Sequence, residues 1–312
     1  MTKINDSVSI PSALLEKGGQ GKVLVDGHAI NVRVRKGTSN DIAFLFHGAV
    51  ARDQREIPFF QAFLPDSSSL TQISVFDDSL FHTLSTPIGW YQGHETLPLI
   101  ELLPKMFAAF SEAFESQNPP IFVGGSSGGY AALFYSNLHK NSTAVVANPQ
   151  TNLYTYSTKL GTGVEKCLQG CWTETDDVEA LASKICLDLA VPYSRPGSNR
   201  VIYLQNGADR KHLHTQMGSI MSAVHHRRWP SMTVKVGFWG KLGHSNSIPY
   251  SYISKVVDLV SQYPEATSDE LLQHSLLGSD IPTVTENSTK KPGKTKDGEV
   301  SKNDLINDFL LS

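Results

Sequence analysis

The sequence predicts an α/β protein with a mostly parallel central sheet, helices on both faces and a short cap insertion. Short apolar runs rich in β-branched and aromatic residues alternate with segments whose apolar residues recur at helical spacing. Runs such as 42–46 and 143–147 are apolar at nearly every position, which is typical of strands buried on both faces. Another run, 121–123, leads through a glycine-flanked serine directly into a helix-forming segment.

The expected elements begin with a β-hairpin, because 22–25 and 29–35 alternate in character around Asp26-Gly27, a two-residue turn signal. Strands separated by helices imply parallel crossovers, so the rest of the sheet is expected to be parallel. We expect strands at 42–46, 72–76, 121–123, 143–147, 201–204 and 233–238, and helices at 94–115, 129–138, 213–224 and 252–260.

The domain organisation follows from shifts in composition. Residues 1–19 are polar and are expected to form a loosely packed extension of a main domain at 20–264. Within that domain, 151–199 interrupt the alternation and are expected to form a cap with a helix at 178–189. Residues 265–312 contain few large apolar side chains and are expected to be a disordered tail. Its last part, 305–311, has helical spacing and is either a protein-docking segment or a frayed end.

The bulk composition excludes several classes. A net charge of −3 over 312 residues does not suit a nucleic-acid-binding surface. Neither a signal peptide nor an apolar run near the ~20 residues of a membrane span is visible, and three cysteines do not suggest a disulfide framework, so a cytoplasmic location is expected. Cys167-x-x-x-Cys171 and His212-x-His214 lack the further ligands that a metal site needs, and we expect neither a metal nor a cofactor.

The most informative motif is Gly124-Gly125-Ser126-Ser127-Gly128 between the 121–123 strand and the next helix. It matches G-x-S-x-G, in which small neighbours allow a strained strand-to-helix turn to expose a nucleophilic serine. A register shifted by one residue would make Ser127 the nucleophile. We favour Ser126, because the strand then ends two residues before it and Gly128-Gly129 falls where the new helix packs closely on the sheet. Ser127 would then supply its amide to an oxyanion.

Two further polar residues follow later strands. Asp209 comes after the 201–204 strand, and His244 follows the last strand and precedes the last helix. With Ser126 they give the order nucleophile, acid, histidine, and over roughly 20–264 the chain therefore resembles the α/β-hydrolase superfamily. The resemblance implies that Asp209 orients His244, which acts as the general base. His212 and His214 also follow Asp209, but they are expected to line the pocket or face solvent.

The same resemblance assigns an oxyanion hole and a pocket. The superfamily uses the loop after the strand that ends here in His47-Gly48-Ala49-Val50, so the amide of Ala49, or of Val50, would act together with that of Ser127. His47 and Gly48 are expected to line the substrate pocket. Trp90 and Tyr91 either stack on the substrate at the pocket mouth or cover the core.

The predicted function is a cofactor-independent serine hydrolase (esterase, deacetylase or thioesterase) acting through an acyl-enzyme on a small-molecule or glycan-linked ester. The glycine-serine motif, the Trp90-Tyr91 loop and Ala147-Asn148-Pro149-Gln150 also resemble hydrolase-like proteins of bacterial capsule and surface-glycoprotein export. That resemblance implies an alternative, an O-acyltransferase acting on a glycan or glycoprotein. A non-catalytic binding scaffold on the same fold is the other alternative.

Overall fold

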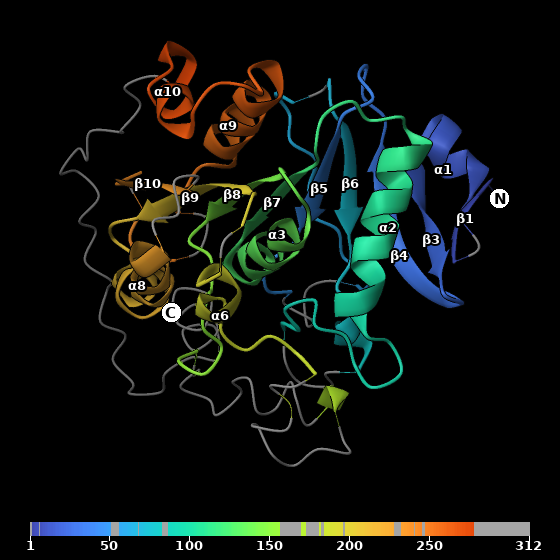
Figure 1. Cartoon of the computed structure of the whole chain (residues 1–312), viewed down its shortest axis with the longest axis horizontal. Helices are drawn as coiled ribbons and strands as arrows, with labels where there is room; N and C mark the ends of the chain where they lie inside the picture. The colour runs from blue at the N-terminus through green and yellow to red at the C-terminus, as the bar shows by residue number, and fades with distance from the viewer. Residues whose placement is uncertain are drawn as a thin grey trace, which may run out of the picture.

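The computed structural model describes residues 2–277 except 6, 51–55, 68, 83–86, 157–169, 173–180, 182–183, 196, 228–231, 240 and 245–246. Within this part of the chain, one sheet contains ten strands in the order β1-β2-β3-β4-β6-β5-β7-β8-β9-β10. Figure 1 shows the sheet crossing the molecule, with β1 at one edge and β10 at the other.

The first four strands form an antiparallel meander: β1 (Thr2–Asn5), β2 (Val8–Ile10), β3 (Gly19–Val25) and β4 (His28–Arg35). The predicted hairpin is confirmed: β3 pairs with β4, and the two turn residues have φ of 48° (Asp26) and 83° (Gly27).

The expectation that residues 1–19 pack loosely is wrong. Strand β2 joins the sheet beside β3, and Val8 and Ile10 are buried. Helix α1 (Ser12–Lys17) buries Leu14 in the same core. The segment looks polar in sequence because only alternate positions of its strand, and one side of a short helix, face the core.

The second half of the sheet is parallel. It consists of β5 (Ile42–Phe46), β6 (Thr71–Val75), β7 (Ile121–Gly125), β8 (Thr143–Ala147), β9 (Arg200–Asn206) and β10 (Met232–Gly237). All five residues of β5, β6 and β8 are buried. The largely apolar sequences of β5 and β8 predict this burial, whereas β6 is buried although it contains Thr71, Gln72 and Ser74. Strand β6 pairs with β4 in antiparallel fashion and joins the two halves.

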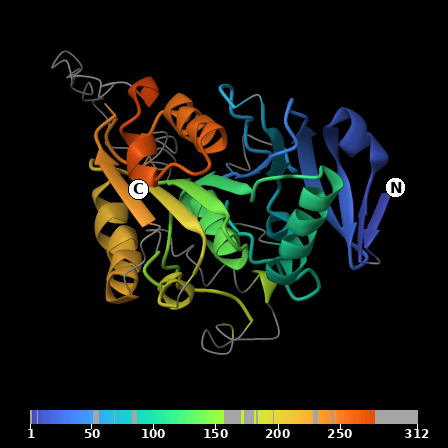
Figure 2. The same cartoon turned by 45° about the horizontal axis from the view of Figure 1, so that its top comes forward.

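Helices cover both faces of the sheet (Figure 2), and each face has its own apolar core. On one face lie α2 (Leu99–Ala113), α3 (Ser126–Leu138) and α8 (Gly218–Arg227). On the other lie α9 (Tyr250–Gln262) and α10 (Ser268–Leu272). Helix α2 begins after Pro98, later than expected, because His94 and Leu97 instead form an isolated β-bridge.

Two other expected helices differ from the predictions. Of the expected 178–189 helix, 178–180 and 182–183 lie outside the described residues, while 184–189 contains turns, bends and a β-bridge. A short helix α6 (Ala190–Tyr193) follows. The expected 213–224 helix starts earlier and is divided into α7 (Arg210–His212), a π-helical turn (Leu213–Met217) and α8.

The beginning of the expected tail is ordered. Leu271 of α10 and Leu277 of a 3-10 turn (Ser275–Leu277) are each 2% exposed and pack beside α9. The docking segment suggested at 305–311 lies outside the described residues. Among the described residues, no helix is both long and apolar enough to cross a membrane.

Candidate active site

Ser126 lies where β7 ends and α3 begins. Its φ is 55°, in the left-handed region, which costs a non-glycine residue roughly 1–3 kcal/mol. Such strain persists only where the surroundings enforce it, and it is expected of the serine in a G-x-S-x-G turn. Ser127 is the next residue of α3, so its amide belongs to the first turn, whose N–H groups have no acceptor within the helix.

Glycines enforce this turn. A Cβ on Gly128 would lie 2.4 Å from the carbonyl oxygen of Phe46, and one on Gly124 would lie 2.2 Å from that of Gly128. Any side chain at either position would therefore collide with backbone, which cannot move aside easily. The two glycines let α3 start in close contact with the ends of β5 and β7.

Asp209 and His244 form a hydrogen-bonded pair, although 35 residues separate them. Asp209 follows β9 and caps α7, while His244 lies in the loop between β10 and α9. His244 Nδ1 lies 2.7 Å from Asp209 Oδ2, and the carboxylate is 3% exposed. An Nδ1–H directed at the carboxylate leaves Nε2 of His244 as a proton acceptor.

The loop that carries His244 is held by two asparagines that the sequence analysis did not assign. Asn206 Nδ2 donates to the carbonyls of Lys241 (3.1 Å) and Gly243 (3.0 Å). Asn148 Nδ2 donates to the carbonyl of His244 (3.4 Å), and its Oδ1 accepts from the Asn206 amide (2.7 Å). Asn148 follows β8, which lies beside the serine strand β7, and Asn206 ends β9, the next strand of the sheet. Polar side chains at the carboxyl ends of these buried strands were the signal available in the sequence.

His212 also binds Asp209, contrary to the expectation that it lines the pocket or faces solvent. Its Nδ1 lies 3.0 Å from Oδ1, and its ring stacks on that of His244 with centroids 3.8 Å apart and planes 11° apart. It is 1% exposed, and burial, together with His244, lowers the pKa of His212 to about 4. His214, the other rival, is exposed. Sequence spacing did give one clue, since His212 is the third residue after a helix-capping aspartate.

The two histidines hold Asp209 in its ionised form. Burial by itself raises the pKa of the Asp209 carboxyl, but hydrogen bonds from His212 and His244 outweigh it and leave the pKa well below its ordinary value. The carboxylate is thus a fixed negative charge beside His244. A group of this kind stabilises an imidazolium that forms when His244 takes up a proton.

Asp209, His212 and His244 are also the one group of potential metal ligands found among the described residues, with ligand atoms within 4.8 Å of one another. Two features favour proton transfer over metal binding here. Each Nδ1 is already paired with a carboxylate oxygen. The two rings are also nearly parallel, so their Nε2 lone pairs lie in almost parallel planes and do not converge on one point, as binding of a shared ion requires.

The loop after β5, residues 47–50, lies against the serine turn. A Cβ on Gly48 would lie 3.6 Å from Ser126 Cβ, so this loop and the nucleophile candidate are neighbours. The Val50 amide donates to the carbonyl of Pro87 (2.9 Å). Of the two alternatives for the first oxyanion donor, Ala49 is therefore the one that stays consistent with the structure.

His47 is buried beneath this loop and contacts it through hydrogen bonds. It does not line the substrate pocket, contrary to the expectation from the sequence. It is 2% exposed; its Nε2 accepts from the Asp77 amide (3.1 Å), and its Nδ1 lies 2.7 Å from the carbonyl of Gly48. Because a carbonyl only accepts, Nδ1 carries the proton and the ring is neutral. The His47 amide in turn donates to Tyr91 Oη (2.8 Å).

Trp90 and Tyr91 cover the core, the second of the two alternatives for them. Each is 1% exposed and each has a positive φ, 53° and 57°. The Tyr91 amide donates to the buried carboxylate of Asp77 (2.9 Å), and the Trp90 indole N–H donates to Gln150 Oε1. The aromatic loop therefore acts on the site through the residues it holds and does not offer a stacking surface to a substrate.

Gln150 is the residue that the sequence analysis missed most clearly. Its Nε2 donates to Ser126 Oγ (3.2 Å), and its amide N–H donates to the carbonyl of Ser126 (3.1 Å). The 148–150 segment thus contacts both the serine turn and the His244 loop. In the sequence, Gln150 stands out only as part of Ala147-Asn148-Pro149-Gln150, because a neutral amide is not one of the residue types of a Ser-Asp-His triad.

Several solved structures share this architecture at low sequence identity. The capsule O-acetyltransferase of Neisseria meningitidis serogroup A is 15% identical, with a TM-score of 0.58, and the match covers 81% of this chain and 100% of that one. The S511A mutant of a puromycin hydrolase is 12% identical, with a TM-score of 0.52, over 83% of this chain and 41% of that one. Pyrococcus horikoshii acylaminoacyl peptidase is 11% identical, with a TM-score of 0.51, over 82% and 44%. No protein-family model and no curated protein sequence matches the chain.

The protein has the α/β-hydrolase fold. At identities of 15% or less, these likenesses establish the fold, and the activity has to be argued from the site. In this α/β-hydrolase fold, Ser126, Asp209 and His244 all follow the carboxyl ends of parallel strands, where ligands bind in open α/β sheets.

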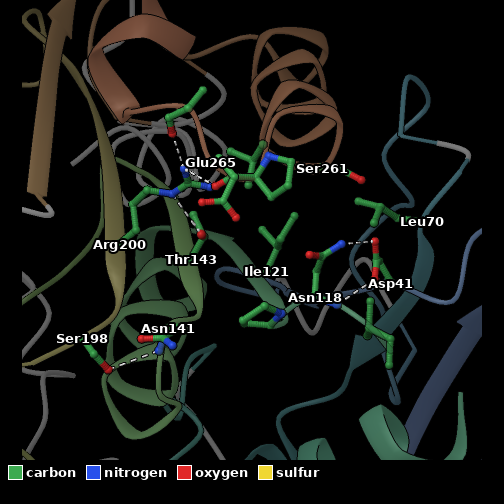
Figure 3. Close-up of a pocket in the computed structure, with 15 residues that line it drawn as sticks. Asp41, Leu70, Asn118, Ile121, Asn141, Thr143, Ser198, Arg200, Ser261 and Glu265 are labelled. Atoms are coloured by element: carbon green, nitrogen blue, oxygen red, sulfur yellow. Dashed lines mark hydrogen bonds between the residues drawn. The ribbon is translucent and has the colours of Figure 1, made fainter. Parts of the chain in front are cut away.

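A cavity of about 230 Å³ lies at the opposite edge of the hydrolase-fold sheet, among the amino ends of its strands (Figure 3). Two of its charged side chains are paired locally: Asp41 accepts from Asn118 Nδ2 (2.8 Å), and Arg200 donates to Thr143 Oγ1 (3.1 Å) and to the carbonyl of Ala266 (2.7 Å). Ser126, Asp209 and His244 do not line this cavity. The candidate active site is therefore at the carboxyl edge of the sheet, away from the cavity.

Proposed function

We propose that the protein is a serine hydrolase or acyltransferase that works through an acyl-enzyme, with Ser126 as nucleophile, His244 as general base and Asp209 as the acid that orients it. The observation that carries this proposal is the 2.7 Å Asp209–His244 pair, held by the 148–150 segment beside a serine with φ of 55°. Order along the chain and position at one sheet edge support the same roles.

In the proposed mechanism His244 Nε2 takes the proton as the Oγ–H bond of Ser126 breaks. The released electron pair forms the bond to the acyl carbon, and the carbonyl π pair moves onto oxygen. The amides of Ala49 and Ser127 hold this oxyanion, each contributing roughly 3 kcal/mol to transition-state stabilisation. This tetrahedral intermediate then collapses: the electron pair on oxygen re-forms the carbonyl, and the bond to the alcohol or thiol breaks. The leaving group takes the proton from His244, and the acyl group remains on Ser126.

The test is labelling of the purified chain with a fluorophosphonate probe, in which Oγ displaces fluoride from phosphorus. We expect the wild type to label and Ser126→Ala to lose labelling. Ser127→Ala is the matched control, because it removes a hydroxyl but keeps the backbone amide that the mechanism uses. Loss of labelling in Ser127→Ala alone would move the nucleophile by one residue, and an unlabelled wild type would favour the non-catalytic scaffold.

The second nucleophile decides between hydrolysis and transfer. Water would make the protein an esterase, deacetylase or thioesterase, and a sugar hydroxyl would make it an O-acyltransferase. The structural match to the whole length of a capsule O-acetyltransferase supports the second reading. A mutant of that enzyme was solved in complex with CoA, so acetyl-CoA is a rational first donor.

Partition of the acyl group separates the two activities. With acetyl-CoA or an aryl acetate as donor, a transferase would acetylate an added oligosaccharide in preference to releasing acetate, and both products would disappear in Ser126→Ala. Free acetate at the same rate with and without oligosaccharide would identify a hydrolase toward these substrates.

A further inference from the structure

Gln150 is held at three points beside the candidate nucleophile. Its side chain is 1% exposed, its Nε2 lies 3.2 Å from Ser126 Oγ, and its backbone N–H donates to the Ser126 carbonyl. The third point is Oε1, which accepts from the Trp90 indole. An indole N–H can only donate, so the oxygen end of the amide faces Trp90 and the nitrogen end faces Ser126.

We propose that Gln150 is a further catalytic residue, whose Nε2–H donates to Ser126 Oγ and prepares it for attack. This inference rests on the proposed function above. A hydroxyl has one proton and two lone pairs. When one lone pair accepts from Gln150, the Ser126 proton is directed away from the amide and is available to His244.

The same donor acts during the reaction. As the proton passes from Oγ to His244 Nε2, negative charge develops on Oγ until its electron pair bonds to the acyl carbon. In the breakdown of the acyl-enzyme, Oγ takes back the electron pair of the C–O bond and recovers its proton from His244. A fixed N–H at Oγ stabilises the charge in both steps, and the neutral amide is unchanged at the end.

Trp90 is the positioning residue for this donor. Its indole fixes the amide orientation, and its own backbone is fixed because the next residue, Tyr91, donates its amide to Asp77 Oδ2 (2.9 Å). The Trp90 carbonyl also accepts from Gln92 Nε2 (3.3 Å). A donor held in advance at both ends loses little entropy and needs little reorganisation when charge develops.

The experiment compares the second-order rate of fluorophosphonate labelling in the wild type, Gln150→Met and Trp90→Phe. Methionine has a similar size but no N–H, so we expect labelling to slow by about 100-fold, as for loss of one oxyanion donor. Trp90→Phe keeps an aromatic ring but frees the amide to turn, and we expect a smaller loss. The matched control is Gln72→Met, which removes another buried amide, one bonded to the Leu64 and Ser67 carbonyls. It is expected to label at the wild-type rate.

The double variant distinguishes positioning from a general structural effect. If Trp90 acts through Gln150, the Gln150→Met/Trp90→Phe double variant labels as slowly as Gln150→Met alone. If the two losses multiply, Trp90 does not act through Gln150 and that part of the inference is wrong.

If the Gln150→Met variant folds and labels at the wild-type rate, the role proposed for Gln150 is overturned and the proposed function is left intact. If the methionine variant does not fold, Gln150→Glu replaces it: the carboxylate keeps an acceptor for the Trp90 indole but cannot donate while ionised. A wild-type rate at pH 8 would then overturn the inference. An unlabelled wild type would remove the proposed function and this inference together.

Discussion

Acid should weaken the folded state through His212, and the size of the effect follows from its burial. Burial and His244 lower the pKa of His212 from 6.5 to about 4. The unfolded chain therefore binds a proton more readily than the folded one. The contribution to stability is complete above pH 6.5 and is lost as the pH falls toward 4.

The magnitude is about 3.4 kcal/mol over the whole range, since each pKa unit corresponds to about 1.36 kcal/mol. Between pH 7.5 and 4.5 about 2.5 kcal/mol of this is lost. Asp209 does not obscure the window: its folded pKa lies below its ordinary value, so its own contribution is lost only as the pH falls below about 4.

The assay is urea unfolding at pH 7.5 and 4.5 for the wild type and His212→Phe, which keeps a ring to stack on His244 but does not titrate. The loss of unfolding free energy on acidification should be about 2.5 kcal/mol smaller in His212→Phe. His139→Phe is the matched comparison, because burial lowers the pKa of His139 to about 4 as well. If His139→Phe reduced the pH dependence and His212→Phe did not, the reasoning about His212 would be refuted.

Three further predictions concern residues around the site. Gly128→Ala places a Cβ 2.4 Å from a carbonyl oxygen and should lower the free energy of unfolding in urea by about 3 kcal/mol. Its control, Gly218→Ala, meets nothing within 4 Å and should raise the free energy of unfolding by up to about 1 kcal/mol; equal effects of the two substitutions would contradict the packing argument. Asp209→Asn offers one acceptor oxygen to two histidines and should slow fluorophosphonate labelling by about 10⁴-fold, and a loss under tenfold would remove Asp209 from the mechanism. Asn206→Ala removes two hydrogen bonds to the His244 loop and should lower both stability, by about 1–2 kcal/mol, and labelling; an unchanged labelling rate would show that the loop does not need this anchor.

Much of the fold was predictable because its signals are local. Strands β5 and β8 have the predicted bounds, since an uninterrupted apolar run can only be buried on both faces. The errors occurred where the signal is weak in sequence: β2 is only three residues long, α1 exposes half of its residues, and α10 is only five residues long. Short amphipathic elements gain their stability from the surface they pack on.

The sequence by itself determined the glycine-serine turn at 124–128, the strands that carry it and the order of Ser126, Asp209 and His244. Glycine spacing, apolar runs and chain order can all be read from the sequence without knowing which distant residues meet. Only the tertiary structure decided which polar groups meet. Gln150 reaches Ser126 across 24 residues and Trp90 across 60, and His212 shares a carboxylate with His244, which the sequence analysis did not foresee. Such contacts form because parallel strands bring their carboxyl ends to one edge of the sheet, where residues distant in sequence become neighbours. Polar side chains buried there must form hydrogen bonds with one another, and sequence spacing does not show which pairs will form.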